Sequence, residues 1–204
     1  MKKLPFLLIF LFLFSSSCSQ ENTYFQRVLN ADSESENWLL HGRTYDESRF
    51  SPLKDINDSN VQDLGLAWSF ETGTNRGHET TPIVVDGMMF ISAPWSVVFA
   101  LDPKTGEKLW SFDPQADKAW ARNACCDVVN RGVAVWEDQV IFATIDGRLI
   151  SLNKDSGKVN WDVLTIDKSK PYTITGAPRI IDGKIIIGNG GGEYGVRGYI
   201  SAYD

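Results

Sequence analysis

A repeat of 51 residues constrains the fold of this chain more than any other feature of its sequence. Residues 98–112 (VFALDPKTGEKLWSF) align with residues 149–163 (LISLNKDSGKVNWDV), and residues 199–204 (YISAYD) begin a third copy. The first two copies each read as a strand, a turn of the form Asp/Asn-x-x-Ser/Thr-Gly, and a second strand that contains a tryptophan. A fixed period of this length predicts one supersecondary unit that stacks against copies of itself.

Turn signals divide each repeat further. Asp-Gly or Glu-Asp separates two β-rich runs within residues 82–93, 133–152 and 178–190, as in β-hairpins. Gly106 and Gly157 stand at turn positions that need a positive φ. Four short strands in roughly 40 to 50 residues are typical of a propeller blade. We therefore predict an all-β fold, a β-propeller of four-stranded blades, with the first three to four blades in this chain.

Little helix is expected in such a fold. Residues 57–68 (NDSNVQDLGLAW) are predicted to hold one short helix, capped by Asp58 or Ser59. Residues 65–73 (GLAWSFETG) read as the closing strand of an earlier blade. The tryptophans of the closing strands are expected to pack between blades: Trp68, Trp110 and Trp161.

A propeller is stabilised by closing its blades into a ring, so that no sheet edge stays exposed, and three blades close no ring. Asp204 lies inside the turn of the third copy. We therefore expect residues 19–204 to be the N-terminal part of a longer propeller domain, inactive and poorly folded by itself.

The N-terminus has the layout of a secretory signal peptide. Lys2 and Lys3 precede an apolar run over residues 4–14, and small residues follow. The run is too short to span a bilayer. Because Cys18 follows three serines, the segment resembles a bacterial lipoprotein signal. The sequence leaves lipidation of Cys18 and plain cleavage both open, and we predict a signal peptide over residues 1–18, a periplasmic protein, and membrane attachment only through a lipid on Cys18.

The charge balance argues against nucleic acid as a partner. The net charge is −6, and no run of basic residues occurs beyond the first few positions. A surface that binds a phosphate backbone needs a basic field. We therefore predict no nucleic-acid partner.

Two of the three cysteines, Cys125 and Cys126, are adjacent. Neighbouring Cα atoms lie about 3.8 Å apart, below the roughly 4.4 to 6.8 Å of ordinary disulfides, so a bond between these residues would be strained. Export favours a disulfide. The residues alone leave open a bonded pair and two buried free thiols, whereas a zinc site is disfavoured because His41 and His78 have no ligand spacing.

Four segments carry a resemblance to a known family. They are residues 49–70 (RFSPLKDINDSNVQDLGLAWSF), 77–90 (GHETTPIVVDGMMF), 125–132 (CCDVVNRG) and 188–204 (GNGGGEYGVRGYISAYD). Together they resemble the pyrroloquinoline quinone (PQQ) dependent alcohol dehydrogenases of the methanol and ethanol dehydrogenase type. The adjacent cysteines followed by Asn130 and Arg131, together with the glycine-rich loop that carries Glu193, are more specific than the repeats, which many propellers share.

The resemblance implies an eight-bladed propeller with PQQ near its axis and the ring of the cysteine pair as a flat lid over the cofactor. PQQ carries carboxylates and an ortho-quinone, so its pocket needs cations, hydrogen-bond donors and closely approaching backbone. The implied cofactor contacts are Glu79, Cys125, Cys126, Arg131, Thr175 (with Thr173 as the alternative), Gly190, Gly191 and Gly192. Glu193 is the implied ligand of the metal, Ca²⁺ or a lanthanide.

The implied function is oxidation of a primary alcohol to an aldehyde by hydride transfer to metal-bound PQQ, with electrons passed to a cytochrome c or a similar acceptor. The family's catalytic base lies later in the chain than residue 204, so no catalytic residue is predicted here. No Cys-x-x-Cys-His occurs, so no haem c attachment is predicted within this stretch. Two alternatives remain: a non-catalytic propeller lipoprotein that acts as an envelope scaffold, and a sugar-oxidising quinoprotein.

Overall fold

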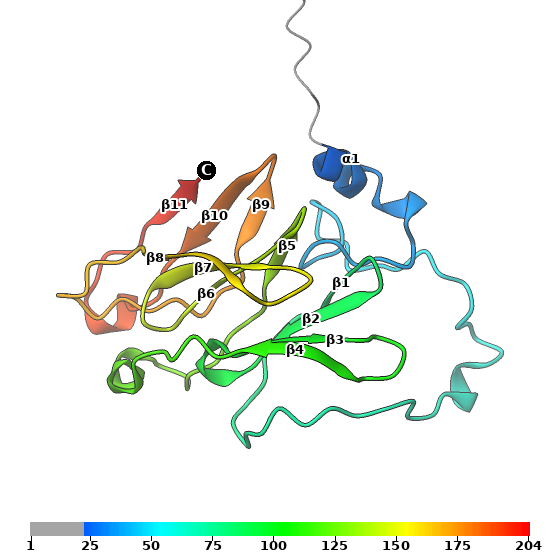
Figure 1. The fold of residues 1–204 in the computed structure, drawn as a ribbon, viewed down its shortest axis with the longest axis horizontal. Coiled ribbons are helices and arrows are strands. Elements are labelled where there is room, and N and C mark those ends of the chain that lie inside the picture. The colour runs from blue at the N-terminus through cyan, green and yellow to red at the C-terminus, as the bar shows by residue number, and fades with distance from the viewer. Residues whose placement is uncertain (1–22) are drawn as a thin grey trace, which may run out of the picture.

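A computed structural model describes residues 23–204, and the predicted signal segment 1–18 with Cys18 lies outside the described residues. Antiparallel sheets follow one another along the chain, each built from consecutive strands (Figure 1). The strands of the first sheet are β1 (Ile83–Val85), β2 (Met88–Ser92), β3 (Val98–Leu101) and β4 (Lys108–Phe112). Those of the second are β5 (Ala134–Trp136), β6 (Gln139–Ala143), β7 (Arg148–Asn153) and β8 (Val159–Leu164). Those of the third are β9 (Arg179–Ile181), β10 (Lys184–Gly188) and β11 (Ile200–Tyr203).

The sheets are blades of a propeller, which confirms the predicted fold class. The first two are complete with four strands each, and the third has three strands within the described residues. Asp86 and Gly87 have φ values of 52° and 77°, as a type I′ turn requires, so the predicted Asp-Gly hairpin is confirmed. In each of the three sheets, a two-residue turn joins the first strand to the second. The residue pairs that flank these turns are Val85–Met88, Trp136–Gln139 and Ile181–Lys184.

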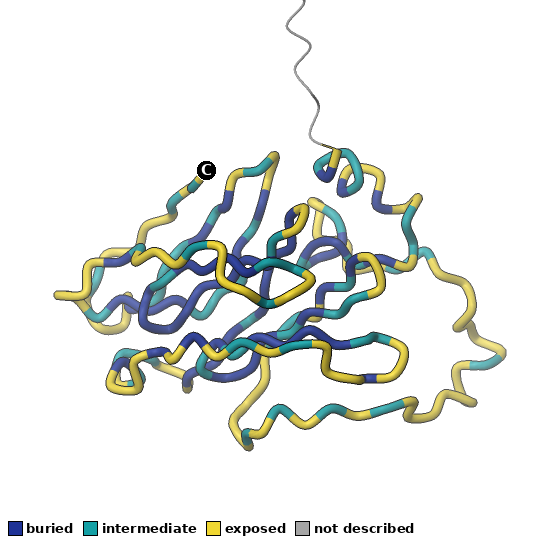
Figure 2. Tube along the Cα trace, in the orientation of Figure 1, coloured by how far each residue is buried: buried dark blue, intermediate teal, exposed yellow. Residues whose placement is uncertain are grey.

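Burial follows the position of a strand within its blade. In β7 the run from Leu149 to Leu152 is buried on both faces, whereas the outer strand β8 is mostly exposed. Figure 2 shows this contrast between the buried inner strands and the exposed outer rim. One apolar cluster runs through all three sheets and includes Phe90, Phe142 and Ile180. Stacking of neighbouring blades therefore forms the core, as the repeat predicts.

Trp110 of the first sheet packs against the second sheet as predicted, and Trp68 packs against the first sheet in the same way. Trp68 donates its indole N–H to Pro103 O at 3.1 Å, and Trp110 donates to Lys154 O at 2.9 Å. Each ring lies on the turn glycine of the next repeat, Gly106 or Gly157. Trp161 is partly buried against the main core.

Gly157 is expected to be intolerant of any side chain. Its φ is 68°, and a Cβ atom would lie 2.8 Å from the Trp110 ring. Gly157→Ala should therefore cost about 1 to 2 kcal/mol for the left-handed backbone and about 1 to 3 kcal/mol more for the clash. Gly183→Ala is the matched control, because Gly183 has a φ of 78° with no atom within 4 Å of an added Cβ. Equal losses of unfolding free energy in the two variants would contradict the clash.

The prediction of a helix over residues 57–68 is wrong. The structure has a single 3₁₀ turn, η2 (Val61–Asp63), and its N-cap Asn60 makes no side-chain cap bond. The Asn60 side chain instead accepts from the Asn57 amide at 2.8 Å, a local bond that competes with a helix. Val61 and Leu64 are exposed, so no packed face stabilises a helix here.

The prediction of a closing strand over residues 65–73 is wrong, because these residues are not paired as a strand, although Trp68 docks as Trp110 does. Within residues 23–204 the one α-helix is α1 (Thr23–Leu29), where Tyr24 and Val28 are buried one turn apart. Tyr24 packs on Trp136 of β5, with ring centroids 5.1 Å apart. No helix in the described part of the chain is long and apolar enough to cross a membrane.

Candidate functional site

The segments that lead into the three blades run side by side. The Thr81 amide donates to Arg131 O at 3.2 Å, and the Arg131 amide donates to Thr175 O at 2.9 Å. Thr173 and Gly190 then form a two-way bridge, with N···O distances of 3.3 and 2.7 Å. Side chains about 50 residues apart in the sequence are thereby brought to one place, which follows from the period of the repeat.

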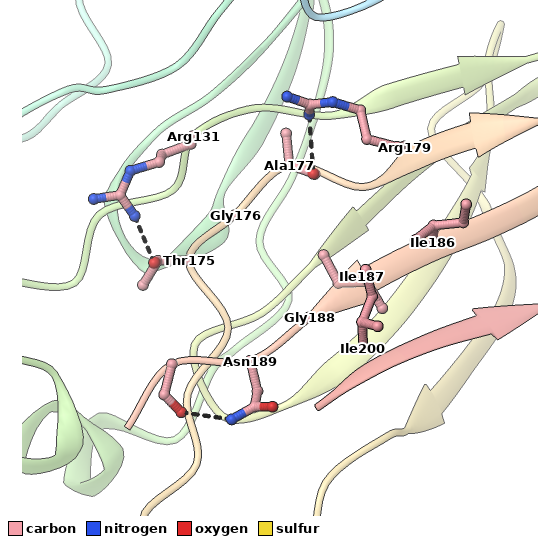
Figure 3. Close-up of a pocket in the computed structure, with 11 residues that line it drawn as sticks. Arg131, Thr175, Gly176, Ala177, Arg179, Ile186, Ile187, Gly188, Asn189 and Ile200 are labelled. Carbon is pink, nitrogen blue, oxygen red and sulfur yellow. Dashed lines mark hydrogen bonds between the residues drawn. The ribbon is translucent and has the colours of Figure 1, made fainter. Parts of the chain in front are cut away.

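Arg131 lies at the centre of this junction. Its Nη2 is 2.8 Å from Glu79 Oε2. Its Nη1 donates to Thr175 Oγ1 at 2.6 Å (Figure 3). The side chains of Arg131 and Glu79 are 43% and 41% exposed. An ion pair this exposed adds little stability, and the guanidinium keeps further N–H donors for a ligand.

Cys125 and Cys126 are joined by a disulfide, so the alternative of two buried free thiols is wrong. Both residues are exposed. They border a cleft of about 70 Å³ that is also lined by the junction residues Arg131, Thr173 and Thr175. Its lining residues are Ala124, Cys125, Cys126, Asp127, Val129, Arg131, Thr173, Thr175, Gly190 and Glu193.

The 3₁₀ helix η4 (Lys118–Asn123) precedes the disulfide and is anchored at both ends of its first turn. The Trp120 indole donates to Tyr172 O at 2.7 Å in a buried bond, and the Asp117 amide donates to Asp146 Oδ2 at 3.2 Å. Burial alone would raise the pKa of the Asp146 carboxyl, but hydrogen bonds from Thr144 and Asp117 hold that pKa below its usual value. The carboxylate therefore stays charged and keeps the helix in place.

The two threonines have different roles in the structure. The Thr175 hydroxyl bonds Arg131, whereas Thr173 is 4% exposed and bridges to Gly190 through its backbone. Both line the cleft. A Cβ atom on Gly190 would lie 2.9 Å from Thr173 Oγ1, so only glycine leaves the backbone open at this point.

The rest of the glycine-rich loop turns the chain toward the disulfide. Gly191 and Gly192 do not line the cleft; Gly191 has a φ of 110° and Gly192 begins the 3₁₀ helix η5 (Gly192–Tyr194), which carries Glu193. The Tyr194 hydroxyl donates to Ala124 O at 3.2 Å and ties this loop to the one that bears the disulfide. Glu193 is exposed and faces the cleft.

The donor set fits one side of a flat, anionic ligand. Sulfur atoms form an apolar wall, Arg131 and Thr175 offer N–H and O–H groups, and Gly190 allows close approach. The volume of about 70 Å³ lies below the roughly 300 to 1,000 Å³ of pockets that enclose small ligands, so these residues supply one wall. Among residues 23–204 no group of three or more His, Cys, Asp and Glu side chains could hold a metal, and Glu193 offers a single carboxylate at the cleft.

A second cleft of about 340 Å³ shares Arg131, Thr175 and Gly190 with the first. Figure 3 shows Arg131 and Arg179 at its border, with Ile186, Ile187 and Ile200 contributed by the third blade. The junction therefore lies between two clefts, one bordered by the disulfide and the other by the isoleucines of the third blade.

A family model described as the glucose/ethanol/alcohol dehydrogenase β-propeller domain, of the PQQ type, matches residues 38–204. The chain belongs to the PQQ-dependent alcohol dehydrogenase family. It is 55% identical over 179 residues to quinohemoprotein alcohol dehydrogenase ADH-IIG of Pseudomonas putida, covering 87% of this chain and 25% of that protein. It is also 55% identical to 1-butanol dehydrogenase (cytochrome c) of Thauera butanivorans, covering 82% of this chain and 24% of that protein.

Solved structures of the PQQ-dependent alcohol dehydrogenase family have the same fold. The quinohemoprotein alcohol dehydrogenase of Comamonas testosteroni superposes with a TM-score of 0.84 at 49% identity, covering 91% of this chain and 28% of that chain. A europium-containing methanol dehydrogenase superposes with a TM-score of 0.83 at 39% identity, covering 88% of this chain and 32% of that chain. The chain thus spans about a quarter of the length of the relatives it matches.

Several residues at or near the site were not predicted from the sequence. Trp120, Asp146 and Ala124 contribute anchors or lining, yet none lies in a motif with a chemical pattern. Asn130 had a signal, because it directly precedes Arg131 in CCDVVNRG. A buried polar side chain next to a ligand-facing cation is a candidate for positioning it.

Proposed function

We propose that the protein encoded by the complete gene is an exported PQQ-dependent alcohol dehydrogenase that oxidises a primary alcohol to an aldehyde. In this proposal the described residues form one wall of the cofactor site. The single observation that carries it is the cleft that joins the Cys125–Cys126 disulfide, the Arg131–Thr175 pair and Glu193. Family membership and the names of the relatives support the same reaction class.

Each residue has a task that its chemistry suits. Arg131 binds a carboxylate or quinone oxygen, because a guanidinium offers two parallel N–H donors. Thr175 holds the Arg131 side chain in place at 2.6 Å and presents its hydroxyl to the same space. The disulfide gives a rigid apolar surface against which a planar ring system can lie.

PQQ, when bound, accepts the hydride of the alcohol. Glu193 offers a hard oxygen ligand for a Ca²⁺ or lanthanide ion, whose positive charge would favour that transfer. The europium in the name of one relative supports a lanthanide as an alternative to calcium. We assign no proton acceptor among the described residues.

The proposal extends to the electron acceptor and the compartment. Cytochrome c stands in the name of the Thauera butanivorans relative, and we propose a cytochrome c or a similar acceptor here. The signal-like residues 1–18 support export to the periplasm, with or without a lipid on Cys18. The mass of the mature N-terminus checks this: an uncleaved N-terminus at Met1 would contradict export.

A direct assay tests the proposed reaction. The protein expressed in a periplasm from its complete gene should reduce an artificial dye in the presence of PQQ, Ca²⁺ and ethanol or 1-butanol. A second series with La³⁺ in place of Ca²⁺ distinguishes the metals. Faster turnover with glucose than with alcohols would favour the sugar-oxidising alternative. If the protein takes up no PQQ and shows no activity with either metal, the result would favour the scaffold instead.

A further inference from the structure

A buried polar network joins the neighbours of the two residues that form the exposed ion pair. Thr80 follows Glu79 in the chain, and Asn130 precedes Arg131. The Ser92 hydroxyl lies between them, 3.1 Å from Thr80 Oγ1 and 3.4 Å from Asn130 O. Ser92 is fully buried and Asn130 is 1% exposed. The network therefore sets the backbone positions from which Glu79 and Arg131 reach each other.

The Asn130 carboxamide is fully hydrogen-bonded. Its Nδ2 donates to Ser96 Oγ at 3.1 Å and to Ala143 O at 2.8 Å, and its Oδ1 accepts from the Gly132 amide at 3.1 Å. These partners belong to the turn before β3, the end of β6 and the residue after Arg131. A buried network with every member paired fixes a single local arrangement.

The same side chain helps hold a turn beneath the disulfide. Trp95 and Ser96 have φ values of 66° and 61°, which bulky residues rarely adopt. The Trp95 amide donates to Val128 O at 2.9 Å, while Asn130 holds Ser96. The Trp95 ring packs in a small apolar cluster with Ala121 and Ala124, the residue before Cys125. The turn thus supports the loop that carries the disulfide.

Asn130 itself does not line the cleft. The Glu79–Arg131 pair is too exposed to orient a long arginine side chain by its own strength. We propose that Asn130 is a positioning residue that places Arg131 and the disulfide at a fixed separation for PQQ. This inference rests on the proposed function and adds to it a buried determinant of cofactor affinity.

The test compares two buried polar deletions in the same blade, made in the protein expressed from its complete gene. Asn130→Ala removes the network, whereas Ser151→Ala is the control, because Ser151 is fully buried in β7 and donates to Gln139 Oε1 at 2.7 Å away from the cleft. PQQ binding to the apoprotein is followed by fluorescence titration. We expect Asn130→Ala to raise the dissociation constant of PQQ about tenfold and Ser151→Ala to raise it less than about twofold. Equal dissociation constants for the two variants overturn the inference.

A second measurement needs no cofactor. Hydrogen exchange of the amides in residues 128–132 should accelerate in Asn130→Ala and stay unchanged in Ser151→Ala, because the Gly132 amide loses its acceptor. Unchanged exchange in both variants overturns the inference. If the unmodified protein takes up no PQQ, the proposed function falls and the inference falls with it. If the unmodified protein takes up PQQ and the two variants bind it with equal affinity, the inference about Asn130 is overturned while the proposed function stands.

A double-mutant cycle tests whether Asn130 acts through Arg131. In an Arg131→Lys background, Asn130→Ala should weaken PQQ binding by less than about threefold, because the guanidinium that Asn130 positions is already lost. A full tenfold loss in that background would show that Asn130 does not act through Arg131.

Ser96→Gly is a second variant that tests the network. It keeps the fold, because glycine accepts the φ of 61°. It should weaken PQQ binding about threefold, because it removes one partner of Asn130. Unchanged affinity in Ser96→Gly contradicts the network.

Discussion

Glu193→Ala is expected to lower the rate of alcohol oxidation roughly a thousandfold in the protein expressed from its complete gene. Glu193 borders the cleft from the 3₁₀ helix η5, and a carboxylate there is the kind of ligand that a hard cation prefers. Loss of a metal that contributes several kcal/mol to the transition state accounts for a change of this size. The metal content of the purified protein should fall together with its activity.

Glu107→Ala is the matched control for the loss of one carboxylate. Glu107 is exposed in the turn between β3 and β4, outside the residues that line the cleft. That variant should keep its metal and its rate within about twofold, as exposed substitutions do. Full activity of Glu193→Ala without added metal would remove Glu193 from the site.

Cys125→Ser is expected to slow alcohol oxidation about tenfold to a hundredfold while the fold is retained. The disulfide fixes a flat wall of the cleft, and small misplacements of groups at a reaction site cause losses of this order. The free energy of unfolding should fall by no more than about 1 kcal/mol, because a bridge between neighbours closes the shortest of loops. Thermal unfolding and steady-state rates measure the two effects separately.

The double variant Cys125→Ser with Cys126→Ser controls for the thiol that a single substitution releases. Both variants break the same bond, so their rates should agree within about twofold. A single variant much slower than the double would assign the loss to the free thiol of Cys126. Normal turnover in either variant would show that the disulfide is dispensable.

Local patterns predicted the blades well. Asp86-Gly87 and the repeat turns specify their hairpins through residues close in sequence, so the strand order followed from the chain itself. The predicted helix over residues 57–68 failed because its asparagine side chains bond the backbone and no core covers it. Helix α1 was missed because its stability comes from packing on Trp136, far along the chain.

For the candidate site, the sequence by itself determined the chemical groups: the adjacent cysteines, Arg131, the threonines and Glu193 in motifs with a recognisable order. Only the tertiary structure decided how these groups meet. It gave Thr175 the bond to Arg131, and it placed Gly190, but not Gly191 or Gly192, at the cleft.

The same division holds for the residues that support the site. Ser92 and Thr80 lie in no motif with a chemical pattern, and the bonds that join Asn130 to Ser92 and Ser96 form only when two blades stack. The physical reason is the range of the interactions. A turn or an adjacent pair of cysteines is specified by neighbours, whereas a buried hydrogen bond depends on which distant groups the closed core leaves within about 3 Å of each other.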